Sequence, residues 1–355
     1  MKERNRLMDK LRTIALDYVS SAGGCAVGIA TTETLAGGPP STDLSFVLPG
    51  AESAVVFAVP LDQTLIEPFL GKKDRLSHER DNFQVNYLAG GIALGLADFL
   101  RQRGCEAKPV SPNNVYRPEG LKAGVMLPDI SLRYLAVRAG IAHFGLSGNV
   151  ITRQAGAAVI LGAVITVGNL APTEPLPDED NYCDECRLCM ASCGSDFMDQ
   201  KEKDSVTLGG REYTYSKRRS QLRCQFVCGG FSGLHKSGKW SSWSPGRWRI
   251  PETDEDILSA LRPGFQAFNL WPEIEGGQYH VRMRKKLLLT CGNCQLICHP
   301  NKEIRRRRHK LLLENGVVVQ RDDGLLEALP PEEARSYVDS LRSEVKAVYG
   351  VAPTN

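Results

Sequence analysis

Apolar side chains recur at helical spacing in three stretches of the first half of the chain. Residues 1–24 are predicted to form an amphipathic helix, with Leu7, Leu11, Ile14, Tyr18 and Val19 on one side. The stretch 83–100 repeats Phe83, Tyr87, Leu88, Ile92, Leu96, Phe99 and Leu100 at the same period, and Gly104 is its expected stop. A third helix is expected at residues 130–139, ending at Gly140.

Four short apolar runs outside these helices are predicted to be strands. They are residues 25–30, 53–60, 105–110 and 157–167, and the last is rich in β-branched side chains. Alternating strands and helices over the first 170 residues favour a layered α/β or α+β domain. Cys25 and Cys105 have no other cysteine at ligand spacing, so both are interpreted as small buried hydrophobic residues.

The proline-rich segment 170–178 marks the expected domain boundary. We predict an α/β domain at residues 1–172, a cysteine-rich domain at 173–310 and a C-terminal part at 311–355. The stretch between Phe197 and Tyr279 is interpreted as a loop-rich insertion in the second of these domains.

The C-terminal part is expected to contain a hairpin and a helix. Residues 310–321 include an Asn315-Gly316 pair between apolar runs, which predicts a β-hairpin with its turn at that pair. Pro330 is expected to open the last helix. Its apolar stripe would consist of Tyr337, Leu341, Val345 and Val348, with Gly350 as the cap.

The composition indicates a soluble globular protein and little more. The chain has 355 residues, 42% of them hydrophobic and 24% charged, which is ordinary for a globular protein. The net charge of +3 makes the whole molecule a poor electrostatic match for nucleic acid. No run approaches the roughly 18 apolar residues of a membrane helix, and residues 1–24 lack the apolar core of a signal peptide. We therefore expect a cytoplasmic protein without a membrane partner.

Cysteine spacing carries the clearest chemical signal. Nine of the eleven cysteines lie between Tyr182 and Pro300. The first four are Cys183, Cys186, Cys189 and Cys193, with two, two and three residues between them, which is the spacing of cubane iron–sulfur clusters. Three thiolates at this spacing wrap one cube, and the fourth points away from it toward a second cube. The remaining five are Cys224, Cys228, Cys291, Cys294 and Cys298.

The spacing therefore predicts two [4Fe–4S] clusters. The first would be held by Cys183, Cys186, Cys189 and Cys298, and the second by Cys193, Cys224, Cys291 and Cys294. Eight ligands are needed, so one cysteine of the middle pair is spare, and Cys228 is the alternative to Cys224. Zinc bound by separated cysteine pairs is the other interpretation, but four cysteines within eleven residues are too crowded for one tetrahedral ion. Disulfides fit poorly because the chain shows no secretory signal.

The segment 134–152, which reads Ala139-Gly140-Ile-Ala-His143-Phe-Gly145-Leu-Ser-Gly148-Asn149 at its centre, resembles the corrinoid-binding segment of epoxyqueuosine reductases and reductive dehalogenases. A two-cluster cysteine pattern follows this segment in those families too, and the resemblance covers roughly residues 50–300. It implies a nitroreductase-like domain that binds cobalamin, followed by a ferredoxin-like module that holds both clusters. It also implies that the reduced cofactor acts on a substrate, while the protein supplies orientation and a proton.

The resemblance assigns cofactor-binding roles to Gly140, His143, Gly145, Gly148 and Asn149. Its glycines would let the backbone approach the cofactor closely, and tight strand–helix turns are their alternative role. His143 replaces an aromatic residue of those families. It is read as a cobalt ligand, a proton donor or a core histidine.

The departures from the family pattern concern the proton donor above all. An ungapped alignment puts Met126 where epoxyqueuosine reductases have an aspartate. Asp129, three residues later, is the candidate catalytic acid, with a helix-capping carboxylate as its other interpretation. Gly194 also stands where a proline usually follows the fourth cysteine. The dehalogenases use a tyrosine as donor, for which Tyr213, Tyr215 and Tyr279 are candidates here.

Two further features have open interpretations. Trp240, Trp243 and Trp248 are expected to wall a substrate pocket or to form a small core. The basic run 302–310 is expected to bind RNA phosphates, to attract an acidic electron donor, or to be a solvated face.

The first functional hypothesis is a cobalamin-dependent iron–sulfur reductase of a small organic molecule or a modified tRNA base, served by a ferredoxin- or flavodoxin-type donor. The alternative is an electron-transfer protein that reduces a partner corrinoid protein and does no substrate chemistry itself. A third hypothesis, an RNA-binding module, rests on the basic run alone.

Overall fold

The computed structural model describes residues 2–112, 116–119, 127–257, 259–260, 268, 270–275 and 291–341, with side chains from Arg6 onward. Its first half is built on a four-stranded sheet in the order β1-β2-β6-β3, and every neighbouring pair is antiparallel. The strands are β1 (Ala26–Thr31), β2 (Ser53–Pro60), β3 (Ala107–Val110) and β6 (Val159–Thr166). This arrangement is the α+β form of the predicted class.

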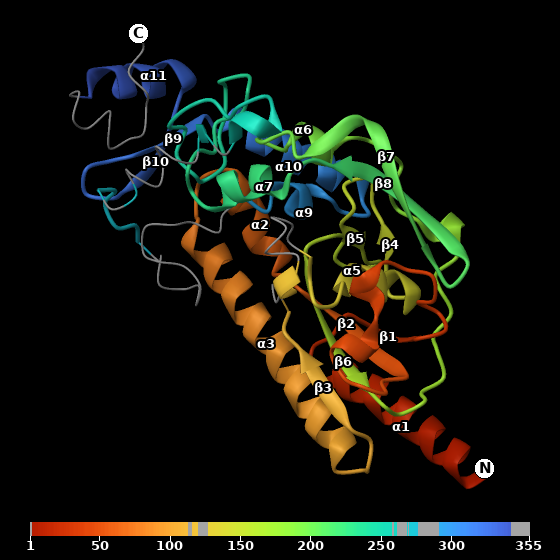
Figure 1. Cartoon of the computed structure of the whole chain (residues 1–355). Helices are drawn as coiled ribbons and strands as arrows, with labels where there is room; N and C mark the ends of the chain where they lie inside the picture. Colours follow the sequence, from red (N-terminus) through yellow and green to blue (C-terminus); the bar gives the residue numbers. More distant parts are fainter. Residues whose placement is uncertain are drawn as a thin grey trace.

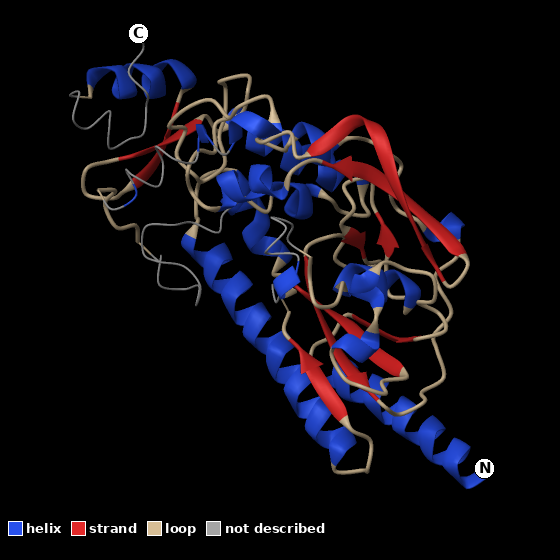
Figure 2. Ribbon diagram, viewed as in Figure 1, coloured by secondary structure: helices blue, strands red, loops and turns tan. Residues whose placement is uncertain are grey.

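Helices cover both faces of this sheet (Figures 1 and 2). The long helices α1 (Lys2–Ser21) and α3 (Leu76–Arg101) pack on one face, and α5 (Leu132–Arg138) packs on the other. Alternate residues of β2 belong to different cores: Val55, Phe57 and Val59 to the first, and Ala54, Val56 and Ala58 to the second. Because both faces are buried, β2 and β6 are continuous apolar runs without polar alternation.

The predicted elements of the first half are found, with shifted ends. The third helix is shorter than expected, and α3 begins at Leu76, seven residues before the apolar repeat. α2 (Gln63–Leu70) lies between β2 and α3, and Asp62 caps it by accepting a hydrogen bond from the Thr64 backbone N–H. Short 3₁₀ turns occupy Pro40–Thr42, Leu44–Phe46 and Asp178–Asp180.

α3 also corrects one expectation from composition. Among the described residues, α3 is long and apolar enough to cross a membrane, judged by length and composition only. From the sequence, no membrane-spanning run is expected. In this fold α3 packs against β3 and β6, and its inward residues belong to the first core.

Between α5 and β6 lies the short antiparallel pair β4 (His143–Phe144) and β5 (Val150–Ile151). The second half follows β6. Its elements in chain order are α6 (Leu188–Ala191), β7 (Met198–Leu208), β8 (Arg211–Arg218), α7 (Gln221–Cys228), α9 (Asn293–Ile297), α10 (Lys302–Glu314), β9 (Val317–Gln320), β10 (Leu326–Leu329) and α11 (Pro331–Ser340). Figure 1 shows the β7–β8 ribbon on one side of this half and the β9–β10 pair with α11 at the opposite end.

Three predictions for this half need correction. The stretch expected to be loop-rich holds the β7–β8 ribbon and α7. The hairpin expected at residues 310–321 is wrong, because α10 continues to Glu314 and β9 pairs with β10 instead. The last helix begins as expected but ends at Ser340, and Val345, Val348 and Gly350 of its predicted stripe and cap lie outside the described residues.

The first core extends past the expected boundary near residue 172. Trp240, Trp243, Leu296, Ile297, Leu312 and Val318 pack in the same cluster as the side chains of α1 and α3. Trp243 donates a hydrogen bond from Nε1 to the Phe69 carbonyl at the end of α2, 2.9 Å away. Trp240 and Trp243 therefore serve as core residues that fix the cysteine-rich half against the sheet half.

Candidate metal centre

Two short helices bring the cysteine runs together. α6 carries Cys189 and α9 carries Cys294, and the two helices pack against each other. Each begins just after a residue in the left-handed region, Arg187 at φ 59° and Gly292 at φ 52°. A left-handed arginine is uncommon, so the Cys186–Cys189 loop is tightly wound.

The first group of thiols surrounds one hollow. Cys183, Cys186, Cys189 and Cys298 line one small pocket, together with Gly145, Leu146, Ser147, Arg187, Leu188, Ile297 and Arg305. Burial raises the pKa of the Cys189 thiol to about 12, and the neighbouring Cys183 and Cys186 add to the shift. The pKa of Cys298 is also raised by burial and then by Cys189 and Cys183, while Arg305 acts in the opposite direction. These four are the residues predicted for the first cluster.

The second group contains five thiols. Burial raises the pKa of Cys294 far above its usual range, and Cys291, Cys193 and Cys224 contribute as neighbouring charges. Cys224 and Cys228 lie one turn apart on α7, with their Sγ atoms 3.8 Å apart. Hydrogen bonds to Cys224 and Cys291, together with burial, raise the pKa of Cys228, whereas the hydrogen bond from Cys228 lowers that of Cys224. The structure therefore places both cysteines of the middle pair at the second group.

The donor chemistry of both groups fits iron–sulfur clusters. Buried thiols with raised pKa values stay protonated unless a metal takes the place of the proton, and cubane clusters are held by four thiolates each. N–H groups also point at the sulfurs: Leu146 donates to Cys183 Sγ over 3.2 Å, and Phe197 donates to Cys193 Sγ over 3.3 Å. Such hydrogen bonds stabilise negative charge on cluster ligands.

A single-ion site needs all of its ligand atoms close to one point. A zinc ion with Zn–S bonds of about 2.3 Å holds its sulfurs roughly 4 Å apart, whereas a cube places each cysteine on a different iron. Within the described ranges, no three His, Cys, Asp or Glu side chains form a compact group of the kind that holds one ion.

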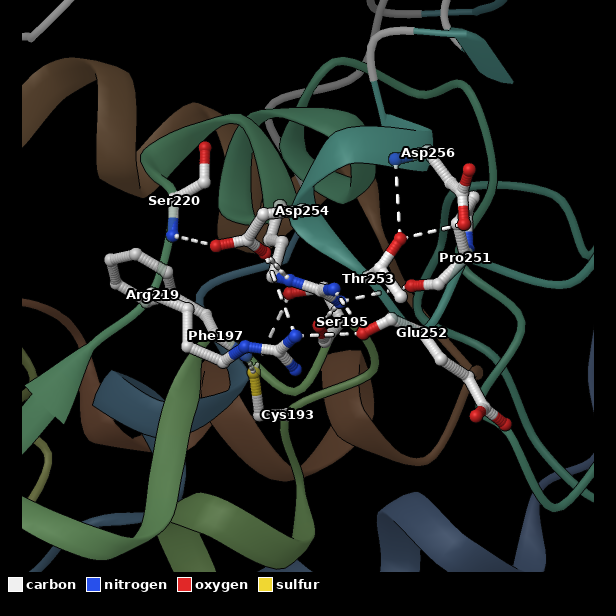
Figure 3. A network of polar contacts seen from close by, with 11 residues as sticks. Cys193, Ser195, Phe197, Arg219, Ser220, Pro251, Glu252, Thr253, Asp254 and Asp256 are labelled. Atoms are coloured by element: carbon white, nitrogen blue, oxygen red, sulfur yellow. Dashed lines mark hydrogen bonds and ion pairs between the residues drawn. The ribbon is translucent and has the colours of Figure 1, made fainter.

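A buried arginine network supports the second group. The Arg223 side chain on α7 is 1% exposed, and it forms an ion pair with Asp254. Its guanidinium donates to the carbonyls of Ser195 and Pro251, both over 3.0 Å. Figure 3 shows Ser195, Pro251 and Asp254 gathered near Cys193. The network therefore fixes the chain just after Cys193 to α7 and to the segment around Asp254.

The glycines of the corrinoid-like segment are explained by protein packing. Gly140 has φ 67°, and a Cβ there would collide with the carbonyl of Glu174. A Cβ on Gly145 would meet Ile151 at 2.7 Å, and one on Gly148 would meet the Arg218 and Tyr215 side chains at 3.1 Å. Tight turns at Gly140 and Gly148, both at positive φ, and the close approach of Ile151 to Gly145 each require glycine in this packing.

His143 and Asn149 face protein groups as well. His143 is 7% exposed on β4, its Nε2 has no hydrogen-bond partner, and burial lowers its pKa. Asn149 donates from Nδ2 to Cys294 Sγ over 3.4 Å and accepts from Arg218 over 3.3 Å. Of the predicted cofactor-binding residues, Gly145 thus lines the pocket of the first cysteine group, and Asn149 contacts Cys294 of the second group.

The proton-donor candidates are not gathered at one site. Asp129 Oδ1 accepts from the Ile130 backbone N–H over 2.7 Å, and Ser131, not Asp129, caps α5. The Tyr215 hydroxyl lies 2.9 Å from that of Tyr134, and burial together with this contact raises its pKa. Tyr213 lies within 3.4 Å of Arg138. Met126 and Tyr279 lie outside the described residues.

The basic run is divided between surface and interior. It lies on α10, where Arg305 and Arg308 are buried. Arg308 donates to the Leu296 carbonyl over 2.9 Å and to Gln63 over 3.0 Å, and Arg307 pairs with Glu67 at 2.6 Å. A fully solvated basic face is therefore wrong for this run. Sequence reasoning missed the structural roles of Arg223, Arg305 and Arg308, because no local pattern marks an arginine as buried.

Comparison with known proteins gives a structural likeness only. No family model matches the chain, and no curated protein matches it in sequence. Epoxyqueuosine reductase from Bacillus subtilis matches at 16% identity and a TM-score of 0.44, over 97% of this chain and 76% of that one. The enzyme from Streptococcus thermophilus matches at 17% and 0.38, over 56% of this chain and 55% of that one. The catabolic reductive dehalogenase NpRdhA matches at 13% and 0.44, over 92% of this chain and 36% of that one.

The chain is similar in structure to epoxyqueuosine reductases and reductive dehalogenases. The resemblance predicted from the sequence is confirmed to this extent. The chain spans about half the length of the Streptococcus thermophilus enzyme. At these identities and scores, the likeness assigns neither an activity nor a ligand to the chain.

Proposed function

We propose that this protein is an iron–sulfur oxidoreductase that carries low-potential electrons through two [4Fe–4S] clusters. The observation that carries the proposal is the arrangement of nine cysteines in two adjoining groups. Four of them line one pocket, and the other five, among them Cys291 and Cys294, form the second group. Each group supplies the four thiolates that one cube requires. When bound, the clusters would supply reversible one-electron chemistry at low potential.

Exposure suggests the direction of electron flow. Cys186 is exposed, whereas the other eight cysteines of the two groups are partly buried. Cys294 of the second group lies within electrostatic reach of Cys189 of the first, so the two cluster sites are neighbours. We infer that a ferredoxin- or flavodoxin-type donor delivers electrons at the Cys186 edge and that the second cluster passes them on.

The acceptor has two proposed forms. In the first, which the sequence resemblance implies, a cobalamin held by this chain accepts the electrons and reduces a small organic substrate or a modified base. In the second, the acceptor is a partner corrinoid protein and this chain does no substrate chemistry. The segment that contains Gly140, His143, Gly145 and Gly148 would hold the corrin in the first form and has only a structural role in the second, so the cobalt content of the protein distinguishes the two forms.

Cysteine variants test the cluster assignment. Cys186→Ala and Cys224→Ala should each leave roughly half of the iron, because each removes one ligand of one cube. Cys228→Ala should keep the full iron content on the proposed assignment, in which Cys224 is the fourth ligand and Cys228, whose Sγ lies 3.8 Å from that of Cys224, is spare. Iron and sulfide would be measured on anaerobically reconstituted protein, with Cys25→Ala as the control outside both groups. Full iron in Cys186→Ala would contradict the first cluster. Half iron in Cys228→Ala with full iron in Cys224→Ala would reverse the choice within the pair.

A further inference from the structure

Arg305 is a buried cation beside the first group of cysteines. It lies in the basic run on α10, and its side chain is only 3% exposed. Its guanidinium donates to the Tyr182 carbonyl over 3.2 Å and to Asp184 over 3.1 Å. The same side chain lines the hollow formed by Cys183, Cys186, Cys189 and Cys298.

These contacts join the two chain segments that supply the ligands. Tyr182 and Asp184 flank Cys183, the first ligand of the group. Arg305 stands in the first turns of α10, which begins four residues after Cys298. Asn301 caps this helix by accepting hydrogen bonds from the backbone N–H groups of Glu303 and Ile304. Arg305 therefore ties the loop of the first ligand to the helix that follows the last one.

The charge of Arg305 also bears on the electron. A guanidinium remains protonated even when buried, so its positive charge is permanent. Its side chain lines the same pocket as Cys183, Cys186, Cys189 and Cys298, so this charge lies beside the thiols of the first group. Asp184 offsets part of this charge, but it also pairs with Lys302 at 3.0 Å. A fixed cation beside a cluster stabilises the reduced, more negative form and raises the reduction potential.

We propose that Arg305 is a positioning residue that holds the ligand loop of the first cluster and raises the reduction potential of that cluster. This inference rests on the proposed two-cluster function. It gives the basic run a role that neither RNA binding nor surface solvation supplies. It also distinguishes Arg305 from Arg306, the next residue on α10, which is exposed and carries the same charge.

The test is a redox titration followed by EPR on the full, anaerobically reconstituted chain. Arg305→Met removes the charge and keeps much of the volume, so one of the two midpoint potentials should move to a more negative value while the other stays. Arg305→Lys keeps the charge and should restore most of that shift. Arg306→Met removes an equal charge from the surface and should change neither potential. Unchanged potentials in Arg305→Met at full iron content, or an equal shift in Arg306→Met, would overturn the proposal.

A second pair of variants covers the case in which Arg305→Met fails to hold the first cluster. Asp184→Asn leaves Arg305 with less compensating charge, so the same midpoint potential should become more positive. Glu185→Gln is the matched control, since Glu185 is exposed and pairs with Lys203 instead. No shift in Asp184→Asn, or an equal shift in Glu185→Gln, would also overturn the role of Arg305. Failure of the two-cluster function itself would appear earlier, as an absence of cubane signals in the wild-type protein.

Discussion

Burial alone changes the chemistry of some residues, and His78 on α3 is the clearest case outside the cysteine groups. Its side chain is 5% exposed, and its ring centroid lies 4.4 Å from that of Phe69. Its Nδ1 has no hydrogen-bond partner, and burial lowers its pKa to about 4. The nearest charged residues on the same helix, Arg75 and Glu79, pair with each other. His78 is therefore neutral at pH 7.

This neutrality predicts a loss of stability in mild acid. The unfolded chain takes up a proton near pH 6.5, whereas the folded chain does so only near pH 4. The folded state thus binds fewer protons between these values, and the free energy of unfolding should fall by up to about 3 kcal/mol as the pH drops from 6.5 to 4. His78→Phe keeps an aromatic ring against Phe69 and should flatten this part of the profile. Anaerobic unfolding at several pH values measures both proteins, and equal slopes would contradict the prediction.

Local spacing predicted the cysteine groups but not what surrounds them. The x2, x2, x3 spacing of Cys183 to Cys193 is specific enough that two groups of cysteines could be proposed before any fold was known. The placement of Cys224 and Cys228 beside Cys291 depends on how α7 packs, and spacing does not encode that. Arg305 and Asp184 meet across 121 residues of sequence, so their contact has no local signature either.

Among the elements, α7 shows how one helix connects several loops. Arg223 on its buried side bonds to Ser195, Pro251 and Asp254, while Cys224 and Cys228 lie on the same helix. Arg219, just before the helix, reaches the same carboxylate at 3.6 Å but is 29% exposed. The two arginines therefore form a matched pair that differs in burial.

Removal of Arg223 should be far more costly than removal of Arg219. Arg223→Ala leaves the buried carbonyls of Ser195 and Pro251 without their donor and removes the buried partner of the Asp254 ion pair, which should cost about 2–4 kcal/mol. Arg219→Ala should cost less than about 1 kcal/mol, because solvent screens that pair. Denaturant unfolding of the reconstituted proteins gives the comparison. Similar losses in the two variants would show that the network does not support the Cys193 segment as described.

Two turns show why the hydrophobic pattern mispredicted the secondary structure of the second half. The Gly209-Gly210 turn has φ 55° and 77°, as a tight hairpin requires, but the charged residues of β7 conceal the strand alternation. Asn315-Gly316 looks like a hairpin turn, yet Leu312 is buried in the first core and keeps α10 helical. Gly316, at φ 70°, then ends that helix. In both cases tertiary packing decided between two locally permitted structures.

At the scale of the whole molecule, one core runs from the sheet half into the cysteine half. Apolar periodicity predicted most strands and helices of the sheet half, because each of them buries one face or two. It could not predict that Trp240, Trp243 and Leu296 join the same core as α1 and α3. The two cysteine groups are thus built against a packed scaffold, which would suit centres that must hold their ligands at fixed positions.

The measurement that tests the central claim most directly is the metal content of the wild-type protein. The chain would be purified without oxygen, reconstituted with iron and sulfide, incubated with cobalamin and passed through gel filtration before iron, sulfide, zinc and cobalt are measured. The two-cluster account predicts about eight irons and eight sulfides per chain, with EPR signals of two reduced cubanes. Retained cobalt would select the form of the proposal in which this chain holds the corrinoid. About one zinc per chain with little iron or sulfide would contradict the account.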